Sequence, residues 1–290
     1  MQKITPNLWF NRNAKEAVDF YTAVFPEGKI TFTSYYPTEG LADFQKEFAG
    51  DVLAINFEIM GHAFTAINAD NTFKPNPSVS FSIMCKTKDE VNALWEKLID
   101  GGSVLMPLQK YDFSEHYGWL SDKYGVSWQM IALGDIPMTQ TIVPSFMFTG
   151  ANAGKAEEAI SFYTSIFRNT KVGDIFRYPK GSEPDKEGTI AHSIITLEGQ
   201  SFIAMDSARK HDFNFSEGVS LNISCKDQAE IDYFWDSFIK NGGTESVCGW
   251  LKDRYGVSWQ INPEDMEELM QRPGAFPKMM EMKKIIITDF

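Results

Sequence analysis

The stretch Gly118-Trp-Leu-Ser-Asp-Lys-Tyr-Gly-Val-Ser-Trp-Gln-Met130 returns 131 positions later as Gly249-Trp-Leu-Lys-Asp-Arg-Tyr-Gly-Val-Ser-Trp-Gln-Ile261, with ten of the thirteen residues identical. Two tryptophans, two glycines and a glutamine recur at the same spacing, which composition alone would not produce. The match therefore indicates an internal duplication. The fold of the first copy is therefore expected in the second, and any site is expected twice or as a diverged pair.

Shorter matches extend the repeat outward from this motif. They pair Pro6–Phe10 with Pro144–Phe148, Glu16–Thr22 with Glu158–Thr164, and Val79–Lys86 with Val219–Lys226. For a chain of 290 residues, a typical size of roughly 150 residues per domain predicts two domains. We place them at residues 1–137 and 138–264, followed by a C-terminal helix and tail at 265–290.

The composition limits the class of protein more than its function. The chain is 43% hydrophobic and 23% charged and has no long apolar run, which argues against a membrane span or a secretory leader. Three cysteines are too few for a disulfide framework, so we expect a cytoplasmic protein in which Cys85 and Cys225 are buried packing residues. A net charge of −12 without a basic cluster argues against nucleic acid and anionic membranes as partners.

The pattern of apolar residues predicts a β-α-β-β-β order that occurs twice in each repeat, which is an α+β fold. Residues 3–10 alternate as a strand, and apolar residues from 14 to 25 recur at helical spacing. Thr87 and Glu90 have the spacing of a capping box. Residues 105–117 are predicted to form a loop that is either a lid over a site or a tolerated surface insertion. Residues 263–270 are predicted to form a helix capped by Asn262.

These features resemble the vicinal oxygen chelate superfamily, which includes glyoxalase I, extradiol dioxygenases and bleomycin-resistance proteins. The resemblance rests on the module order, on Phe-Tyr at the end of the first helix, and on Asp-x-Tyr-Gly-Val-Ser-Trp-Gln in the last strand. Within the superfamily the chain is most similar to the PhnB-like branch, often labelled 3-demethylubiquinone-9 3-methyltransferase, over nearly its whole length.

The resemblance implies two tandem glyoxalase-like domains of paired β-α-β-β-β modules. Each domain would form a curled mixed sheet around a cavity, with helices outside. Single-repeat relatives usually pair as dimers, so the two repeats here are expected to pair within one chain and to give a monomer.

A polar face is predicted on the strands that would line the cavities. In the strand that begins at Val79, Ser80 and Ser82 point away from Val79, Phe81 and Ile83. In the second repeat, Ser220 and Asn222 occupy the matching positions. Such a face either meets water or lines a pocket.

The superfamily resemblance also implies a divalent metal held by histidine and glutamate side chains. The histidine positions fall on Pro6 or Asn7, Pro144 or Ser145, Ser78 or Ser80, and Gly218 or Ser220, and the glutamate positions fall on Gln129 and Gln260. A neutral amide brings no charge to compensate a dication. We therefore expect no tightly bound catalytic metal, although His192 or Glu58 leaves a weak or substrate-dependent metal site open.

Other common chemistries find little support in the sequence. There is no Gly-rich turn after a first parallel strand for S-adenosylmethionine, so the methyltransferase label has no chemical basis here, and there is no Gly-x-Ser-x-Gly nucleophile elbow. No catalytic residue is assigned. We expect binding of a small organic molecule by a set of polar residues on the strands: Asn7, Glu58, Ser80, Ser82, Gln129, His192, Ser220, Asn222 and Gln260.

Two alternatives remain open beside simple binding. One is a metal-dependent lyase, isomerase or dioxygenase whose nonstandard ligand set includes His192 or Glu58. The other is a degenerate scaffold for protein association, in which side chains fill the polar faces of the sheets.

Overall fold

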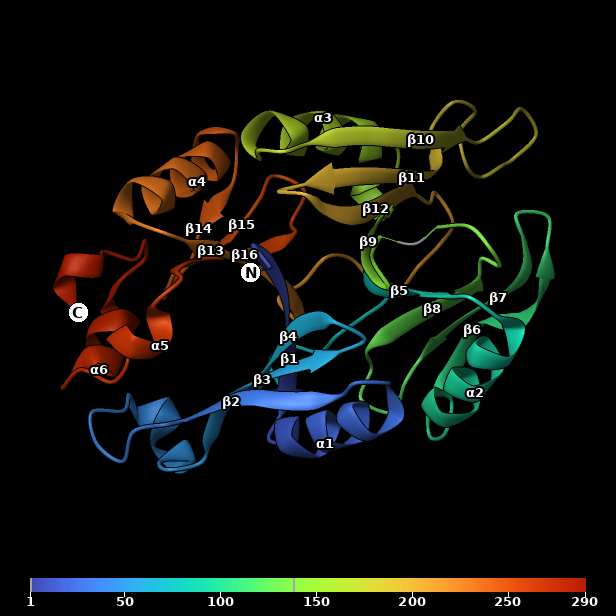
Figure 1. The fold of residues 1–290 in the computed structure, drawn as a ribbon. Helices are drawn as coiled ribbons and strands as arrows, with labels where there is room; N and C mark the ends of the chain where they lie inside the picture. Colours follow the sequence, from blue (N-terminus) through green and yellow to red (C-terminus); the bar gives the residue numbers. More distant parts are fainter. Residues whose placement is uncertain (1, 138) are drawn as a thin grey trace.

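The computed structural model describes residues 2–137 and 139–290, so Met138, the predicted start of the second domain, lies outside the described residues. The chain contains four β-α-β-β-β modules in the predicted order (Figure 1). The first comprises β1 (Ile4–Asn11), α1 (Ala14–Val24), β2 (Lys29–Tyr35), a 3-10 helix (Asp43–Phe48), β3 (Val52–Ile59) and β4 (His62–Ala69). The second comprises β5 (Val79–Cys85), α2 (Lys88–Leu98), β6 (Ser103–Tyr111), β7 (Ser114–Ser121) and β8 (Ser127–Ala132).

The second repeat follows the same order and ends in two additional helices. The third module comprises β9 (Ile142–Phe148), a 3-10 turn (Gly150–Asn152), α3 (Ala156–Ile166), β10 (Lys171–Arg177), β11 (Ile190–Leu197) and β12 (Gln200–Asp206). The fourth comprises β13 (Val219–Cys225), α4 (Gln228–Lys240), β14 (Thr244–Glu245), β15 (Trp250–Lys252) and β16 (Ser258–Pro263). The C-terminal segment contains α5 (Met266–Leu269), α6 (Ala275–Glu281) and a last 3-10 turn (Ile287–Asp289).

The sixteen strands form two mixed sheets of eight strands, and each sheet takes one module from each repeat. Sheet A has the order β14-β15-β16-β13-β1-β4-β3-β2, and sheet B has the order β10-β11-β12-β9-β5-β8-β7-β6. The modules join where β1 runs antiparallel to β13 and where β5 runs antiparallel to β9. The two repeats therefore pair within the chain, as expected, by continuing each other's sheets.

The helices pack on the apolar faces of these sheets through the residues that the periodicity predicts. On α1, Ala17, Val18 and Tyr21 are fully buried. The capping box of Thr87 and Glu90 is present at the start of α2. Cys85 and Cys225 are buried free thiols in the core, as predicted. None of the helices in the described part of the chain is long and apolar enough to cross a membrane.

The residues that both copies of the duplicated motif share form a hydrogen-bond network around Asp122 in the first copy. Asp122 is 4% exposed and accepts hydrogen bonds from Tyr21 OH (2.8 Å), Trp128 Nε1 (2.8 Å) and the backbone N–H groups of Tyr124 (2.8 Å) and Val126 (3.1 Å). Burial raises the pKa of this carboxyl, and the four hydrogen bonds act against the increase. The bond to Tyr21 connects the two modules of one repeat, although these modules belong to different sheets.

The second copy repeats the same arrangement around Asp253. Its carboxylate accepts from Tyr163 OH (2.6 Å), Trp259 Nε1 (3.0 Å) and the backbone N–H groups of Tyr255 (2.8 Å) and Val257 (3.0 Å). In each copy the tight turn depends on a glycine at positive φ, at Gly125 (+86°) and Gly256 (+89°) in turn. The Phe-Tyr pair and the Asp-x-Tyr-Gly-Val-Ser-Trp motif are thus two ends of one buried contact.

Two local predictions are wrong. The segment 105–117 is not a loop: it extends β6 and β7 into a hairpin, because Tyr117 and the neighbouring Trp119 bury their rings against sheet B. Asn262 and Pro263 do not begin a helix, because they continue the pairing of β16 with β13. The helix α5 starts at Met266 after Asp265.

Candidate functional site

Polar side chains form a row across sheet A. The register of neighbouring strands places Asn56, Thr65, Asn7, Ser220, Ser258 and Lys252 side by side, in this order from β3 to β15. Residues that alternate with them, such as Leu8, Leu221 and Trp259, belong to the hydrophobic core. We call the face that carries the row the polar face of sheet A.

Four of the predicted ligand-binding residues meet on this face: Asn7, Ser220, Asn222 and Gln260. Gln260 Nε2 donates to Ser220 Oγ (2.9 Å), and Asn262 Nδ2 donates to Asn222 Oδ1 (2.8 Å). Glu58 lies apart from them near the sheet edge, where it forms an ion pair with Lys29 (2.7 Å). The sequence prediction therefore located a cluster that draws residues from both repeats.

Three polar atoms on this face are buried without a partner. Among the residues that the structure describes, five buried side-chain nitrogen or oxygen atoms have no hydrogen-bond partner, and three of them are Asn7 Oδ1, Ser258 Oγ and Asn262 Oδ1. Asn7 is 5% exposed and Ser258 is 1% exposed. Leaving a buried polar group unpaired costs about 1–3 kcal/mol, so this face carries a cost that a hydrogen-bonding partner would remove.

A pocket of about 190 Å³ lies at the β14–β16 end of the row, with Ser258, Trp250, Lys252 and Glu217 among its lining residues. Lys252 Nζ lies 2.9 Å from Glu217 Oε1. The Trp250 ring is held edge-on against the ring of Trp9, with centroids 6.2 Å apart. The pocket is thus lined by an aromatic side chain, by an ion pair and by a serine whose hydroxyl has no partner in the described chain.

The C-terminal segment lies over the same side of sheet A. Glu267 on α5 accepts a hydrogen bond from Asn56 Nδ2 (2.7 Å) in the polar row. Farther along, the backbone N–H of Cys248 donates to Met282 O (2.7 Å), just before β15. Figure 1 shows α5 and α6 between β2 on one side and β13 to β15 on the other. The segment therefore connects the two arms of sheet A.

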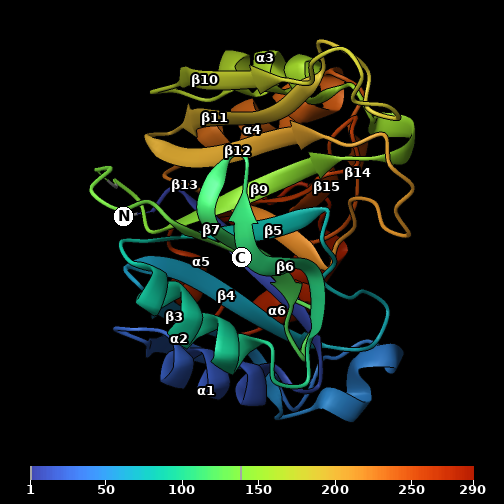
Figure 2. The same cartoon turned by 90° about the vertical axis from the view of Figure 1, so that its right-hand side faces the viewer.

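The corresponding face of sheet B is filled by its own side chains. Gln129 Nε2 donates to Ser80 Oγ (2.7 Å), Tyr117 OH donates to Gln129 Oε1 (2.7 Å), and the hydroxyls of Ser82 and Ser145 lie 2.9 Å apart. A hydrophobic cluster packs there, made of Tyr117, Trp119, Met147, Met106, Tyr111, Ile131, Met205 and Phe213. Figure 2 shows the β6–β7 hairpin, which supplies much of this cluster, in front of β5 and β9.

His192, the remaining predicted site residue, lies on β11 of sheet B. Burial lowers its pKa, which favours the neutral imidazole, and its ring centroid is 6.3 Å from that of Phe176. The first-repeat residues Ser80, Ser82 and Gln129 thus share sheet B with His192, whereas Asn7 and Glu58 lie on sheet A. Sequence reasoning could not make this division because it depends on which modules join.

The two sheets differ most clearly at one pair of equivalent serines. In sheet B, Ser127 Oγ accepts a hydrogen bond from Trp119 Nε1 (2.7 Å). In sheet A, the equivalent Ser258 is unpaired within the described chain, and the equivalent Trp250 packs against Trp9 instead. Ser258 was missed from the sequence, although it precedes Gln260 by two positions and so shares its face.

The residues at the superfamily's metal positions do not fit a tightly held dication. On sheet A these positions carry Asn7, Ser220 and Gln260, which are neutral. Within residues 2–137 and 139–290, no group of three or more histidine, cysteine, aspartate or glutamate side chains is arranged to hold a metal ion. A site without anionic or imidazole ligands lacks the donors that divalent transition metals prefer.

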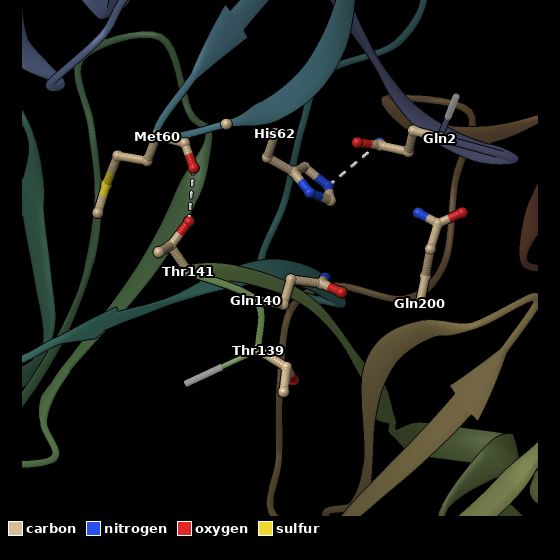
Figure 3. Close-up of a pocket in the computed structure, with 8 residues that line it drawn as sticks. Gln2, Met60, His62, Thr139, Gln140, Thr141 and Gln200 are labelled. Atoms are coloured by element: carbon tan, nitrogen blue, oxygen red, sulfur yellow. Dashed lines mark hydrogen bonds between the residues drawn. The ribbon is translucent and has the colours of Figure 1, made fainter. Parts of the chain in front are cut away.

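A larger pocket of about 350 Å³ lies at the seam between the repeats and is lined by Gln2, His62, Gln140, Thr141 and Gln200, among others. Figure 3 shows these side chains around the opening. Each glutamine already bonds a backbone: Gln2 bonds Ala63, Gln140 bonds Ser201, and Gln200 bonds Ile4, in every case through both amide atoms. Thr141 Oγ1 donates to the backbone oxygen of Met60 (2.6 Å). These contacts hold the modules together and leave few groups for a ligand.

Among the described residues that line the seam pocket, His62 is the one ionisable group. It is 4% exposed, and burial lowers its pKa to about 4. Gln2 Nε2 lies 3.3 Å from His62 Nε2, so a neutral ring whose Nε2 accepts this hydrogen bond fits the arrangement. His62 is therefore a buried neutral group in a structural seam.

Comparisons with known proteins agree with this architecture. The family model described as 3-demethylubiquinone-9 3-methyltransferase matches residues 2–131 and again residues 140–262. A PhnB protein from Bacillus cereus, which carries the same methyltransferase label, is 36% identical over 45% of this chain and 99% of its own, with a TM-score of 0.40. No curated protein sequence matches this chain.

Over nearly the full length, the chain has the fold of glyoxalase I from Zea mays. That structure is 11% identical, covers 93% of this chain and 98% of its own, and has a TM-score of 0.56. The family model matches each repeat separately, and the two matches together cover most of the chain. The chain therefore belongs to the 3-demethylubiquinone-9 3-methyltransferase family, as a tandem PhnB-like member with a glyoxalase-like fold.

Proposed function

We propose that the protein binds a small organic molecule on the polar face of sheet A, in the pocket lined by Ser258 and Trp250, without a tightly bound catalytic metal. The observation that carries this proposal is that Ser258, which is 1% exposed and lines the pocket, has a hydroxyl with no hydrogen-bond partner among the described residues. A ligand that bonds this hydroxyl would remove the cost of leaving it unpaired.

Sheet A is favoured over sheet B by the difference between the two polar faces. In sheet B the equivalent serine is bonded to Trp119, and aromatic and methionine side chains cover the strands. In sheet A the shortened β14–β15 arm and the turn of Trp250 toward Trp9 leave space beside the serine. The fourth module thus leaves room for a ligand at the place that side chains fill in the equivalent second module.

Two alternatives are less well supported. A metal-dependent lyase, isomerase or dioxygenase would use His192 on sheet B or Glu58 on sheet A. At neither position do the described residues include a group of three or more histidine, cysteine, aspartate or glutamate side chains that could hold a metal ion. A pure interaction scaffold accounts for the filled face of sheet B and not for the unpaired groups of sheet A. The methyltransferase label is not supported by the mixed sheets, which differ from the parallel sheet of common S-adenosylmethionine enzymes. We place the protein in the cytoplasm as a monomer, which agrees with its free cysteines.

The proposal predicts that small polar fragments bind the full chain at this pocket. Fragments screened by ligand-observed NMR should include binders that quench tryptophan fluorescence, and Trp250→Ala should weaken them at least tenfold, because it removes one wall. Metal analysis of the untagged protein should show less than stoichiometric Ni, Zn, Fe or Mn. A stoichiometric metal bound at residues of a polar face, or fragments that bind equally well to Trp250→Ala, would contradict the proposal.

A matched pair of serine variants controls for stability. Ser258→Ala removes an unpaired hydroxyl, so the free energy of unfolding should stay unchanged or rise by up to about 1 kcal/mol. Ser127→Ala leaves Trp119 Nε1 without its acceptor and should lower the free energy of unfolding by about 1–2 kcal/mol. Urea titrations of both variants measure this difference, which disappears if Ser258 is paired in solution as Ser127 is.

A further inference from the structure

We propose that the ligand of the Ser258 pocket is a neutral polyhydroxylated molecule about the size of a monosaccharide. This inference rests on the proposed function and names the class of molecule that the pocket recognises. Three features support it: balanced charges around the pocket, unmet hydrogen-bonding groups that are all neutral, and a fixed aromatic wall.

The charged residues of the pocket are paired with each other or with a neighbour. Lys252 pairs with Glu217 (2.9 Å), and Glu245 pairs with Lys283 of the C-terminal segment (3.1 Å). Two carboxylates are thus matched by two ammonium groups, and the local charge sums to zero. An ionic ligand would have to break one of these pairs or bring an uncompensated charge beside it, whereas a neutral ligand disturbs neither.

The groups without partners are a hydroxyl and two amide oxygens. Ser258 lines the pocket and its buried Oγ has no partner in the described chain. Asn7 Oδ1 lies two strands away in the same row and Asn262 Oδ1 lies farther along β16, and both are likewise without a partner there. A ligand hydroxyl both donates and accepts, so it can bond Ser258 and also meet the carboxylate of Glu217 or the ammonium of Lys252. A molecule with several hydroxyls can bond Ser258, Glu217 and Lys252 at once, whereas Asn7 and Asn262 are not among the residues that line the pocket.

Trp250 provides an apolar surface beside this polar set. Its contact with Trp9 is edge-to-face, with an interplanar angle of 80°, and Trp9 is held in turn by its Nε1 bond to the backbone oxygen of Asp70 (2.8 Å). A ring held in this way loses little freedom when a ligand packs on it. The C–H face of a sugar or cyclic polyol is apolar while its rim is hydroxylated, and this matches a tryptophan wall next to serine and charged groups.

The volume of the pocket limits the size of the ligand. Its 190 Å³ is below the roughly 300–1,000 Å³ of sites for drug-sized ligands. A molecule the size of a single six-membered ring with its hydroxyls therefore suits the pocket.

The test compares probes of one shape and three charges on the full chain. Glucose, galactose and myo-inositol are the neutral probes, glucosamine is the cation and glucuronate is the anion, and binding is followed by ligand-observed NMR and tryptophan fluorescence. At least one neutral probe should bind saturably and at least tenfold more tightly than both charged probes. Ser258→Ala should weaken it about tenfold, which corresponds to the loss of one hydrogen bond, and Trp250→Ala should weaken it further.

Ser161→Ala on α3 is the control, because Ser161 is not among the residues that line the pocket. Its hydroxyl donates only to the backbone oxygen of Glu157 among the described residues. It should bind the neutral probe as the wild type does. If glucosamine or glucuronate binds best and this binding depends on Ser258, the class of ligand is wrong while the proposed function stands. If a neutral probe binds but neither pocket variant affects it, the inference is also wrong. If neither the probes nor the fragments bind in a way that depends on Trp250, the proposed function itself fails.

Discussion

Replacing Asp122 by alanine is expected to lower the free energy of unfolding by about 3–5 kcal/mol, and replacing Asp253 should have a similar effect. Each carboxylate accepts four hydrogen bonds in a buried environment. Without the acceptor, a tyrosine hydroxyl, an indole N–H and two backbone N–H groups are left unpaired away from water. Urea titration followed by circular dichroism measures the loss.

Asparagine in place of Asp122 should recover only part of this loss. Its oxygen can still accept from the backbone of the turn, but its amide N–H groups face the indole N–H of Trp128, which can only donate. Asp19→Ala is the control, because Asp19 is an exposed residue of α1 in an ion pair with Lys15, and such pairs contribute about 0–1 kcal/mol. A loss below about 1 kcal/mol for both buried aspartates would show that the shared motif does not hold the modules together.

His62 is expected to make the protein less stable in acid, and His62→Gln should remove this effect. Burial lowers the pKa of His62 to about 4, whereas an exposed histidine has a pKa of about 6.5. Between these values the unfolded chain binds the proton and the folded chain does not, so protonation favours unfolding as the pH falls. Since one pKa unit is worth about 1.4 kcal/mol, the wild type should lose about 3 kcal/mol more than the variant between pH 7 and pH 4.

Glutamine is the substitution that the protein itself uses, because Gln200 occupies the equivalent place in the second repeat. Near pH 7.5, where histidine is neutral in both states, the two proteins should therefore have similar stability. His192 and His211 also have lowered pKa values, but they contribute equally to both proteins and cancel in the difference. Parallel pH profiles for the wild type and His62→Gln would show that folding does not lower the pKa of His62.

The fold could be predicted because the sequence contains the same pattern of motifs and elements in two copies. The duplicated motif revealed the repeat, and helical and strand periodicity then placed the modules, because one apolar side of every element must be buried. The same alternation located the polar faces, including Ser80, Ser82, Ser220 and Asn222, since strand residues two apart share a face. Asn7 and Gln260 were identified from the superfamily resemblance. Trp128 and Trp259, which alternate with Gln129 and Gln260, are fully buried in the core.

The composition of each site could not be predicted in the same way. Pairing of β1 with β13 and of β5 with β9 joins segments more than 50 residues apart, and local patterns carry no information about such a choice. The hairpin that fills sheet B was read as a loop because its strand residues are stabilised by packing against Met147 and Met205, which lie in another module.

The sequence by itself therefore determined the duplication, the module order, the faces of the strands and the absence of charged ligands at the superfamily's metal positions. These properties depend on residue type and on spacing along the chain. Only the tertiary structure decided that the repeats exchange modules between sheets, that Ser127 is bonded while Ser258 is not, and that the C-terminal segment lies across sheet A. Each of these depends on which distant side chains become neighbours. Ser127 and Ser258 are equivalent in the two repeats but differ in hydrogen bonding, because Trp119 donates to Ser127 whereas Trp250 packs against Trp9.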